Sequence, residues 1–179
     1  MKTLTFVVML ISALARAGEG PVHKPVLHSF GPARYAVSAG WKLEETGSTA
    51  DASWRFTKNL DTIELKLLGG QGSRYTSPSD YLSGMEATTM GKAPEKLRQV
   101  QVAGLKVWLF RHGYPINLGD PHVADPHPPQ LAQIEFCIIP YKKNFFLLSW
   151  THASSLPDLD TVGKKAWEFF LTSFTLEKK

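Results

Sequence analysis

The stretch from Leu131 to Trp150, "LAQIEFCIIPYKKNFFLLSW", decides the fold. Two apolar runs flank the polar residues Tyr141-Lys142-Lys143-Asn144, a pattern that predicts two antiparallel strands joined by a tight turn. A second apolar stretch, "AWEFFLTSF" (Ala166–Phe174), follows after a short break and predicts a helix laid over this hairpin. We expect this helix to begin near Pro157. Its packing stripe is expected to comprise Leu159, Val162, Ala166, Phe169 and Phe170.

Two further hairpins are expected upstream, because apolar and polar residues alternate with period two on both sides of a turn. The first is Ala52–Gly70, with its turn at Asn59-Leu60-Asp61. The second is Lys96–Tyr114, with its turn at Ala103-Gly104. Such alternation indicates strands with one buried face and one wet face, as in an antiparallel sheet.

Trp108 lies between Val107 and Leu109, so strict alternation makes this strand apolar on both faces. A strand of this kind is covered on both faces, by a helix or by a partner. We expect helical cover, and a partner-binding groove is the alternative.

A helix is expected between the two upstream hairpins, from about Pro78 to Met90. Ser77 can cap its first turn, and Asp80 favours the positive end of the helix dipole. Gly91 is a natural terminator.

Hairpins interrupted by one helix and closed by another predict an α+β fold. We expect a central antiparallel sheet of about six or seven strands built from hairpins and flanked by two helices, an α-β-α sandwich. Residues 33–179 are expected to form this single domain, because a chain of 179 residues is long enough to close a sizeable core.

The first 17 residues have the pattern of a signal peptide. Lys2 precedes the apolar run Leu4–Ala15, and Ala15-Arg16-Ala17 places small residues at the two positions that a signal peptidase reads. An uncleaved anchor or a buried helix is the alternative, although the run is short for a bilayer span. We expect a periplasmic or secreted protein without a transmembrane anchor after cleavage, and a flexible segment over residues 18–32, which are rich in Pro and Gly.

The net charge does not indicate a nucleic-acid-binding protein, and the cysteine content excludes an internal disulfide. Cleavage would remove Lys2 and Arg16, so Lys+Arg falls from 20 to 18 against 16 acids, a net charge of about +2. This excess is too small to indicate a nucleic-acid partner, which normally needs a clustered basic face. Cys137 is the single cysteine, so no internal disulfide can form, and its apolar strand setting predicts a buried, inert thiol.

A loop rich in proline, histidine and aspartate is the best candidate for chemistry. The tripeptide Asp-Pro-His occurs twice in it, five residues apart. Imidazole and carboxylate groups suit a divalent transition metal. A solvated surface loop would use the same residues, so both interpretations stay open. The candidate metal ligands are His112, Asp120, His122, Asp125 and His127.

The sequence holds no recognised catalytic motif. It has no G-x-S-x-G elbow, and "GGQGSRY" (Gly69–Tyr75) lacks the Gly-Lys-Ser/Thr ending of a phosphate-binding loop. We therefore expect no enzymatic activity, and a hydrolase would need an activated nucleophile that the sequence does not supply.

Three stretches together carry a family resemblance: "YAVSAGWKL" (Tyr35–Leu43), "VQVAGLKVWLF" (Val100–Phe110) and the ending "FFLLSWTHASS…AWEFFLTSFTL" (Phe145–Leu176). Over roughly Tyr35 to Leu176 the chain resembles the PsbP-like/Mog-like superfamily, which includes small exported bacterial proteins. The resemblance implies an α-β-α sandwich and a non-enzymatic role as an adaptor, chaperone or assembly factor. It carries no binding residue over to a numbered position here.

The function expected from these observations is an exported, non-catalytic binding or assembly module without a resident cofactor. Its partner is expected to be another protein or an envelope complex. The alternative is a periplasmic metal-binding protein that uses the His/Asp-rich loop of residues 112–127.

Overall fold

The computed structural model describes residues 24–46, 51–88, 91–115, 131–153 and 161–177. These residues form two helices and ten strands. The elements are β1 (Val26–Phe30), β2 (Ala33–Val37), β3 (Lys42–Thr46), β4 (Ser53–Lys58), β5 (Asp61–Leu68), α1 (Pro78–Thr88), β6 (Glu95–Val102), β7 (Leu105–Pro115), β8 (Leu131–Tyr141), β9 (Asn144–Ala153), α2 (Thr161–Ser173) and β10 (Thr175–Leu176).

A seven-stranded antiparallel sheet forms the centre of the molecule, in the order β3-β4-β5-β9-β8-β7-β6. The α+β class, the strand number and the two flanking helices are confirmed. A second sheet of three strands, in the order β1-β2-β10, was not expected from the sequence. It pairs an early hairpin with the last strand, a contact between chain ends that period-two alternation does not reveal.

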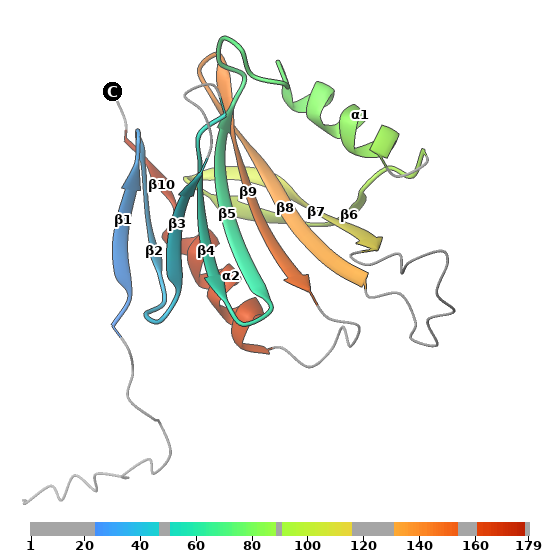
Figure 1. Ribbon diagram of the computed structural model, residues 1–179. Helices are drawn as coiled ribbons and strands as arrows, with labels where there is room; N and C mark the ends of the chain where they lie inside the picture. The colour runs from blue at the N-terminus through green and yellow to red at the C-terminus, as the bar shows by residue number, and fades with distance from the viewer. Residues whose placement is uncertain (1–23, 47–50, 89–90, 116–130, 154–160, 178–179) are drawn as a thin grey trace, which may run out of the picture.

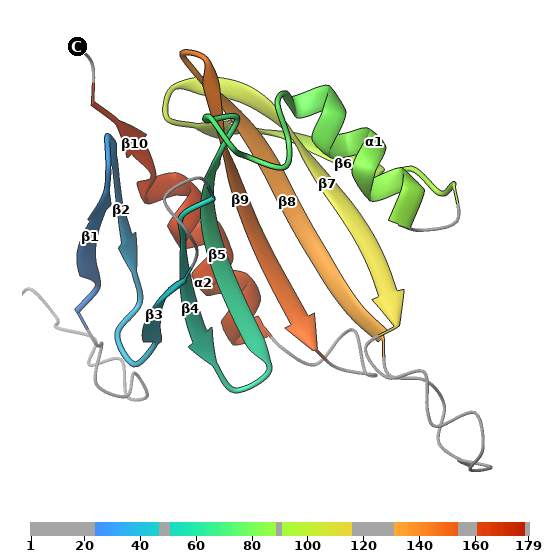
Figure 2. The same cartoon turned by 45° about the horizontal axis from the view of Figure 1, so that its top comes forward.

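Figures 1 and 2 show α1 on one side of the seven-stranded sheet and α2 on the other. We name these sides the α1 face and the α2 face. The three-stranded sheet shares the α2 face, because the Tyr35 ring of β2 lies 5.2 Å from the Phe170 ring of α2 and 5.9 Å from the Phe56 ring of β4. The larger core cluster fills this side of the sheet.

Each of the three predicted hairpins is present with a two-residue turn. Pairing closes at Lys58 and Asp61, at Val102 and Leu105, and at Tyr141 and Asn144. The first turn residues have φ values of 54°, 51° and 54°, as primed turns require. These first turn residues are Asn59, Ala103 and Lys142.

Helix α1 begins where the sequence predicts. The Ser77 hydroxyl accepts a hydrogen bond from the Asp80 backbone N–H at 3.1 Å. The Asp80 carboxylate in turn accepts from the Thr76 N–H at 2.9 Å. These reciprocal bonds satisfy backbone donors that an uncapped helix leaves free. The helix then covers the smaller core cluster of the α1 face with Tyr81, Leu82 and Met85.

Helix α2 packs through a different stripe from the one expected. Val162 is 58% exposed and Phe169 is 37% exposed, whereas Trp167 is fully buried. Ala166 and Phe170 are buried as expected, while Leu159 and the expected start near Pro157 lie outside the described residues. The stripe is rotated because α2 rests on two surfaces at once, the large sheet and β2. The described apolar residues buried along α2 and just after it are Ala166, Trp167, Phe170, Leu171 and Phe174.

Part of the segment expected to be flexible is ordered. Val26–Phe30 form β1, which pairs with β2. Alternate side chains of β1 enter the core, because the His28 ring lies 4.9 Å from Phe56 and the Phe30 ring lies 5.3 Å from Trp54. The prediction of a flexible segment over residues 18–32 is therefore wrong for β1. The predicted signal peptide lies outside the described residues.

A buried polar network joins the first turn of α2 to the sheet. The Asp61 carboxylate is 3% exposed and accepts a hydrogen bond from the Trp150 indole N–H at 2.8 Å. Nδ1 of His152 lies 3.0 Å from the same oxygen. A Cβ atom added to Gly163 would lie 2.2 Å from the Asp61 carboxyl group, so the absence of a side chain allows this close approach. A carboxylate against the start of a helix is also favoured by the helix dipole.

Candidate functional site

The β6–β7 hairpin is the candidate functional site, because its two faces have opposite character. It forms one end of the seven-stranded sheet, with β6 at the edge. Its turn is tied to the end of α2 by a hydrogen bond from the Ala103 backbone N–H to the Phe174 carbonyl oxygen at 3.2 Å. We call the side toward α2 the inner face and the opposite side the outer face.

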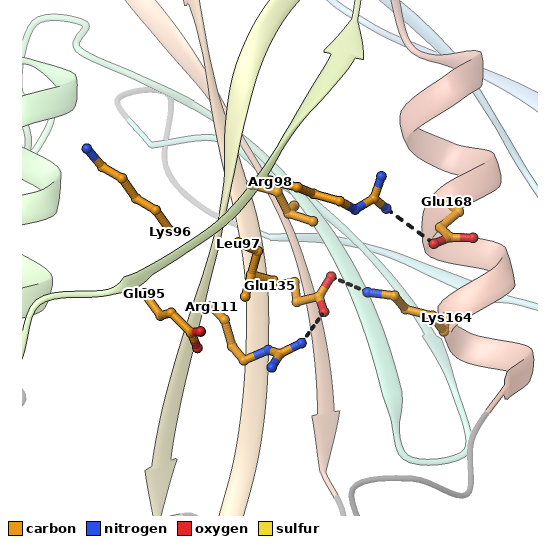
Figure 3. Close-up of a pocket in the computed structure, with 9 residues that line it drawn as sticks. Glu95, Lys96, Leu97, Arg98, Arg111, Glu135, Lys164 and Glu168 are labelled. Atoms are coloured by element: carbon orange, nitrogen blue, oxygen red, sulfur yellow. Dashed lines mark hydrogen bonds and ion pairs between the residues drawn. The ribbon is translucent and has the colours of Figure 1, made fainter.

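The inner face and α2 enclose a depression of about 320 Å³, shown in Figure 3. This volume is at the lower end of the range for small-molecule pockets. Most of its lining residues are charged. They are Glu95, Lys96, Leu97, Arg98, Leu109, Arg111, Glu135, Lys164 and Glu168.

Ion pairs cross this depression and join α2 to the sheet (Figure 3). The Glu135 side chain is 4% exposed and pairs with Lys164 of α2 and, at 3.5 Å, with Arg111 of β7. Arg98 of β6 pairs with Glu168 of α2 at 3.3 Å. These charges compensate one another, and a buried carboxylate needs such partners. The charged side chains of the depression therefore hold α2 against the sheet and are already paired with one another.

A β-bulge at Leu97 separates the charges of β6 between the two faces. Lys96 pairs with Phe110 and Arg98 pairs with Leu109, so β6 carries one extra residue. In a regular strand residues two apart share a face, and the bulge removes this relation. Figure 3 shows Arg98 directed toward α2 and Lys96 directed away from it. The bulge therefore places Lys96 on the outer face.

The outer face is exposed, aromatic and basic. Trp108 pairs with Gln99, and Lys106 pairs with Gln101, so these four side chains share the face with Lys96. All five are exposed, Trp108 at 41%. The Lys96 ammonium lies 5.7 Å from the centroid of the Trp108 ring, a cation–π contact. The expectation that a helix covers Trp108 is therefore wrong, because α1 covers the neighbouring Phe110 cluster and leaves Trp108 exposed.

A second depression, of about 380 Å³, lies beside α1 on the other half of the α1 face. Glu64 pairs there with Arg55 at 3.1 Å and with Lys66 at 2.8 Å. Its charges are compensated within the sheet, and none of its described lining residues is an exposed aromatic side chain. It is therefore the weaker candidate.

The structure places one residue of the predicted metal site. His112 is 7% exposed on β7, and its Nε2 atom makes no hydrogen bond within the described residues. Burial and the nearby charge of Lys92 lower the pKa of His112, which keeps the imidazole neutral. No three His, Cys, Asp or Glu side chains in the described ranges are grouped closely enough to hold a metal ion. The metal site stays a prediction, because the following residues lie outside the described part of the chain: Asp120, His122, Asp125 and His127.

The position of Cys137 predicts an unreactive thiol in the folded protein. It is fully buried, and burial raises its pKa to about 12. We therefore expect no reaction with a thiol-specific reagent near pH 8 while the chain is folded, and complete labelling in denaturant. A reagent that releases a chromophore when it reacts with a thiol allows the extent of labelling to be measured by absorbance in both conditions. Rapid labelling of the native protein would contradict the buried position of this strand.

The residues of the outer face were only partly accessible to sequence reasoning. Trp108 was recognised as a side chain that breaks the alternation of its strand. Lys96 was missed, because period-two alternation assigns it the same face as Arg98 and no sequence signal marks the bulge. The Asp61 network was missed as well, since its members lie 89 and 91 residues apart along the chain.

The arrangement of strands and helices has counterparts among solved structures. The Ran-binding protein Mog1p of Saccharomyces cerevisiae matches with a TM-score of 0.51 at 11% identity, over 86% of this chain and 96% of its own. A mutant of the protein Mog1 gives a TM-score of 0.50 at 12% identity, over 86% and 95%. This chain therefore shares the fold of these two proteins.

A protein of Bacteroides thetaiotaomicron shares the fold, with a TM-score of 0.52 at 10% identity over 88% of this chain. The match covers 50% of that protein, so this chain spans half its length. At these identities the likeness extends to the fold alone. No protein-family model matches the sequence, and no curated protein sequence matches it either. Neither helix within the described residues has the length and apolarity to cross a bilayer.

Proposed function

We propose that this chain is an exported, non-catalytic module that binds another protein through the outer face of the β6–β7 hairpin. The single observation that carries the proposal is the exposure of Trp108 on a sheet face that lies beyond the cover of α1. Tryptophan is enriched among the residues that dominate protein–protein binding energy, and its exposure to water is otherwise unfavourable.

The fold supports a binding role. Mog1p, which shares the fold, is a Ran-binding protein. The described residues also favour binding over catalysis, since Cys137 is buried and the charged side chains between α2 and the sheet are paired with one another. Export is part of the proposal because of the signal-peptide pattern in the first 17 residues.

The proposal predicts that Trp108→Ala abolishes partner capture while the protein stays folded. A tagged chain is incubated with envelope extract of its own organism, and retained proteins are quantified by mass spectrometry. At least one specific partner should be lost about 30-fold or more, because central tryptophans contribute about 2 kcal/mol or more to an interface. Circular dichroism should show an unchanged fold.

Leu105→Ala is the matched control. Leu105 is 42% exposed in the same strand, yet it pairs with Val102 rather than with a residue of the outer face. Capture should survive this change. Identical sets of retained proteins for the Trp108→Ala variant and the unchanged chain would contradict the proposed binding face.

A further inference from the structure

We propose that the outer face of the β6–β7 hairpin takes an acidic segment of a partner protein, with an apolar side chain of that segment against Trp108. This inference rests on the proposed function and adds the chemistry of the partner. The inference rests on a difference between the two faces of the hairpin: the charges of the inner face form ion pairs, whereas the two lysines of the outer face form none within the described residues.

The outer face holds two cations without an acidic partner. Lys96 and Lys106 form no ion pair within the described residues. Glu95, the acid of the hairpin, lies opposite Arg111 in the β6–β7 register, on the inner face. Seven cations outside the outer face pair with a carboxylate, while exposed lysines such as Lys24 and Lys165 also form no ion pair within the described residues. Those that pair with a carboxylate are Arg34, Lys42, Arg55, Lys66, Arg98, Arg111 and Lys164. Among the described residues, the outer face is therefore distinguished by two unpaired lysines beside an exposed tryptophan.

The bulge at Leu97 creates this charge pattern. In a regular strand, Lys96 would share the inner face with Arg98, where Glu135 and Glu168 lie. The bulge instead leaves its charge on the outer face, beside an exposed ring. An interface works best when a positive surface meets a negative one, so the complementary surface is anionic.

The other side chains of the face define the rest of the ligand. Gln99 and Gln101 are exposed and can donate hydrogen bonds to carboxylate or backbone oxygens. The face of the Trp108 ring carries partial negative charge, so it disfavours a carboxylate and favours an apolar or cationic group. Carboxylates therefore belong at the two lysines and an apolar side chain at the ring.

A protein segment fits these features better than an anionic membrane. Polybasic membrane contacts use clusters of about four to eight cations, each contributing about 1 kcal/mol, and the outer face supplies two lysines. The two glutamines add hydrogen-bonding capacity that a peptide backbone can satisfy. A lipid surface remains an outcome of the test.

The test measures binding of a fluorescent peptide to the purified chain by anisotropy. The probe is a short peptide rich in aspartate and glutamate with one central phenylalanine, and its control carries asparagine and glutamine instead. We expect the acidic peptide to bind, the neutral peptide to bind at least tenfold more weakly, and added salt to weaken the acidic complex. K96E/K106E should weaken binding about tenfold or more, and Trp108→Ala should weaken it as well.

The matched control is K24E/K165E, which changes net charge by the same amount at exposed lysines that are not part of the outer face. It should bind the acidic peptide as the unchanged chain does.

Equal binding of the neutral peptide, or no effect of K96E/K106E, would overturn the inference. Binding to phosphatidylglycerol vesicles, with no binding of the acidic peptide, would overturn it in favour of a lipid surface. In either case Trp108-dependent capture of a protein from extract would leave the proposed function standing, whereas loss of that dependence would remove the proposed function itself.

Discussion

Gly163→Ala is expected to lower the free energy of unfolding by about 3 kcal/mol, although alanine is the better helix former by about 1 kcal/mol. The new Cβ would lie 2.2 Å from the Asp61 carboxyl group. That group cannot move away without loss, because it is 3% exposed and holds the Trp150 indole at 2.8 Å and the His152 ring at 3.0 Å. Chemical denaturation followed by tryptophan fluorescence measures the change.

Two further variants isolate the cause. Lys165→Ala changes an exposed position of the same helix and should alter stability by less than about 0.5 kcal/mol. In an Asp61→Ala background the Gly163→Ala change should cost much less, because the colliding carboxylate is gone and neighbouring substitutions are not additive. A stabilising Gly163→Ala, or the same cost in both backgrounds, would show that α2 does not contact Asp61 in this way.

Trp167→Ala is expected to destabilise the domain by about 4 kcal/mol, whereas Phe169→Ala should cost about 1 kcal/mol or less. Trp167 is fully buried and its ring lies 5.9 Å from that of Phe170, while Phe169 is 37% exposed. Both changes remove a large aromatic side chain from the same helix, so each serves as the control for the other. Thermal melting and denaturant titration compare them directly.

The comparison separates the two possible packing stripes of α2. The stripe expected from the sequence includes Phe169 and omits Trp167. A larger loss of stability for Phe169→Ala than for Trp167→Ala would mean that the helix is rotated about its axis relative to the structure. Which of the two variants loses more stability therefore decides which stripe of α2 is buried.

Most of the architecture was predictable from patterns of residues that are close together in the sequence. The three hairpins were predictable because the turn residues and the period-two alternation lie within a few residues of one another. The start of α1 was predictable for the same reason, since Ser77 and Asp80 cap a helix through neighbouring backbone groups. The buried position of Cys137 followed from its apolar neighbours.

The candidate site was predictable only in part. The sequence showed that Trp108 requires cover on the second face of its strand, and it left a helix and a partner as alternatives. The structure shows that α1 stops short of this residue, a fact that depends on where a helix of 11 residues comes to lie on the sheet. The predicted metal ligands stay a prediction, because His112 is the one member within the described residues.

The sequence by itself determined what depends on near neighbours: the α+β class, the strand pairs that share a turn, the capped helix and the apolar faces of the strands. The tertiary structure alone decided which stripe of α2 is buried, that β1 and β10 join β2, that Asp61 meets Gly163, and that the bulge at Leu97 turns Lys96 toward Trp108. The physical reason is the same in each case. These contacts join segments distant in the chain, and their energies depend on packing and charge compensation in three dimensions, which no periodicity of the sequence encodes.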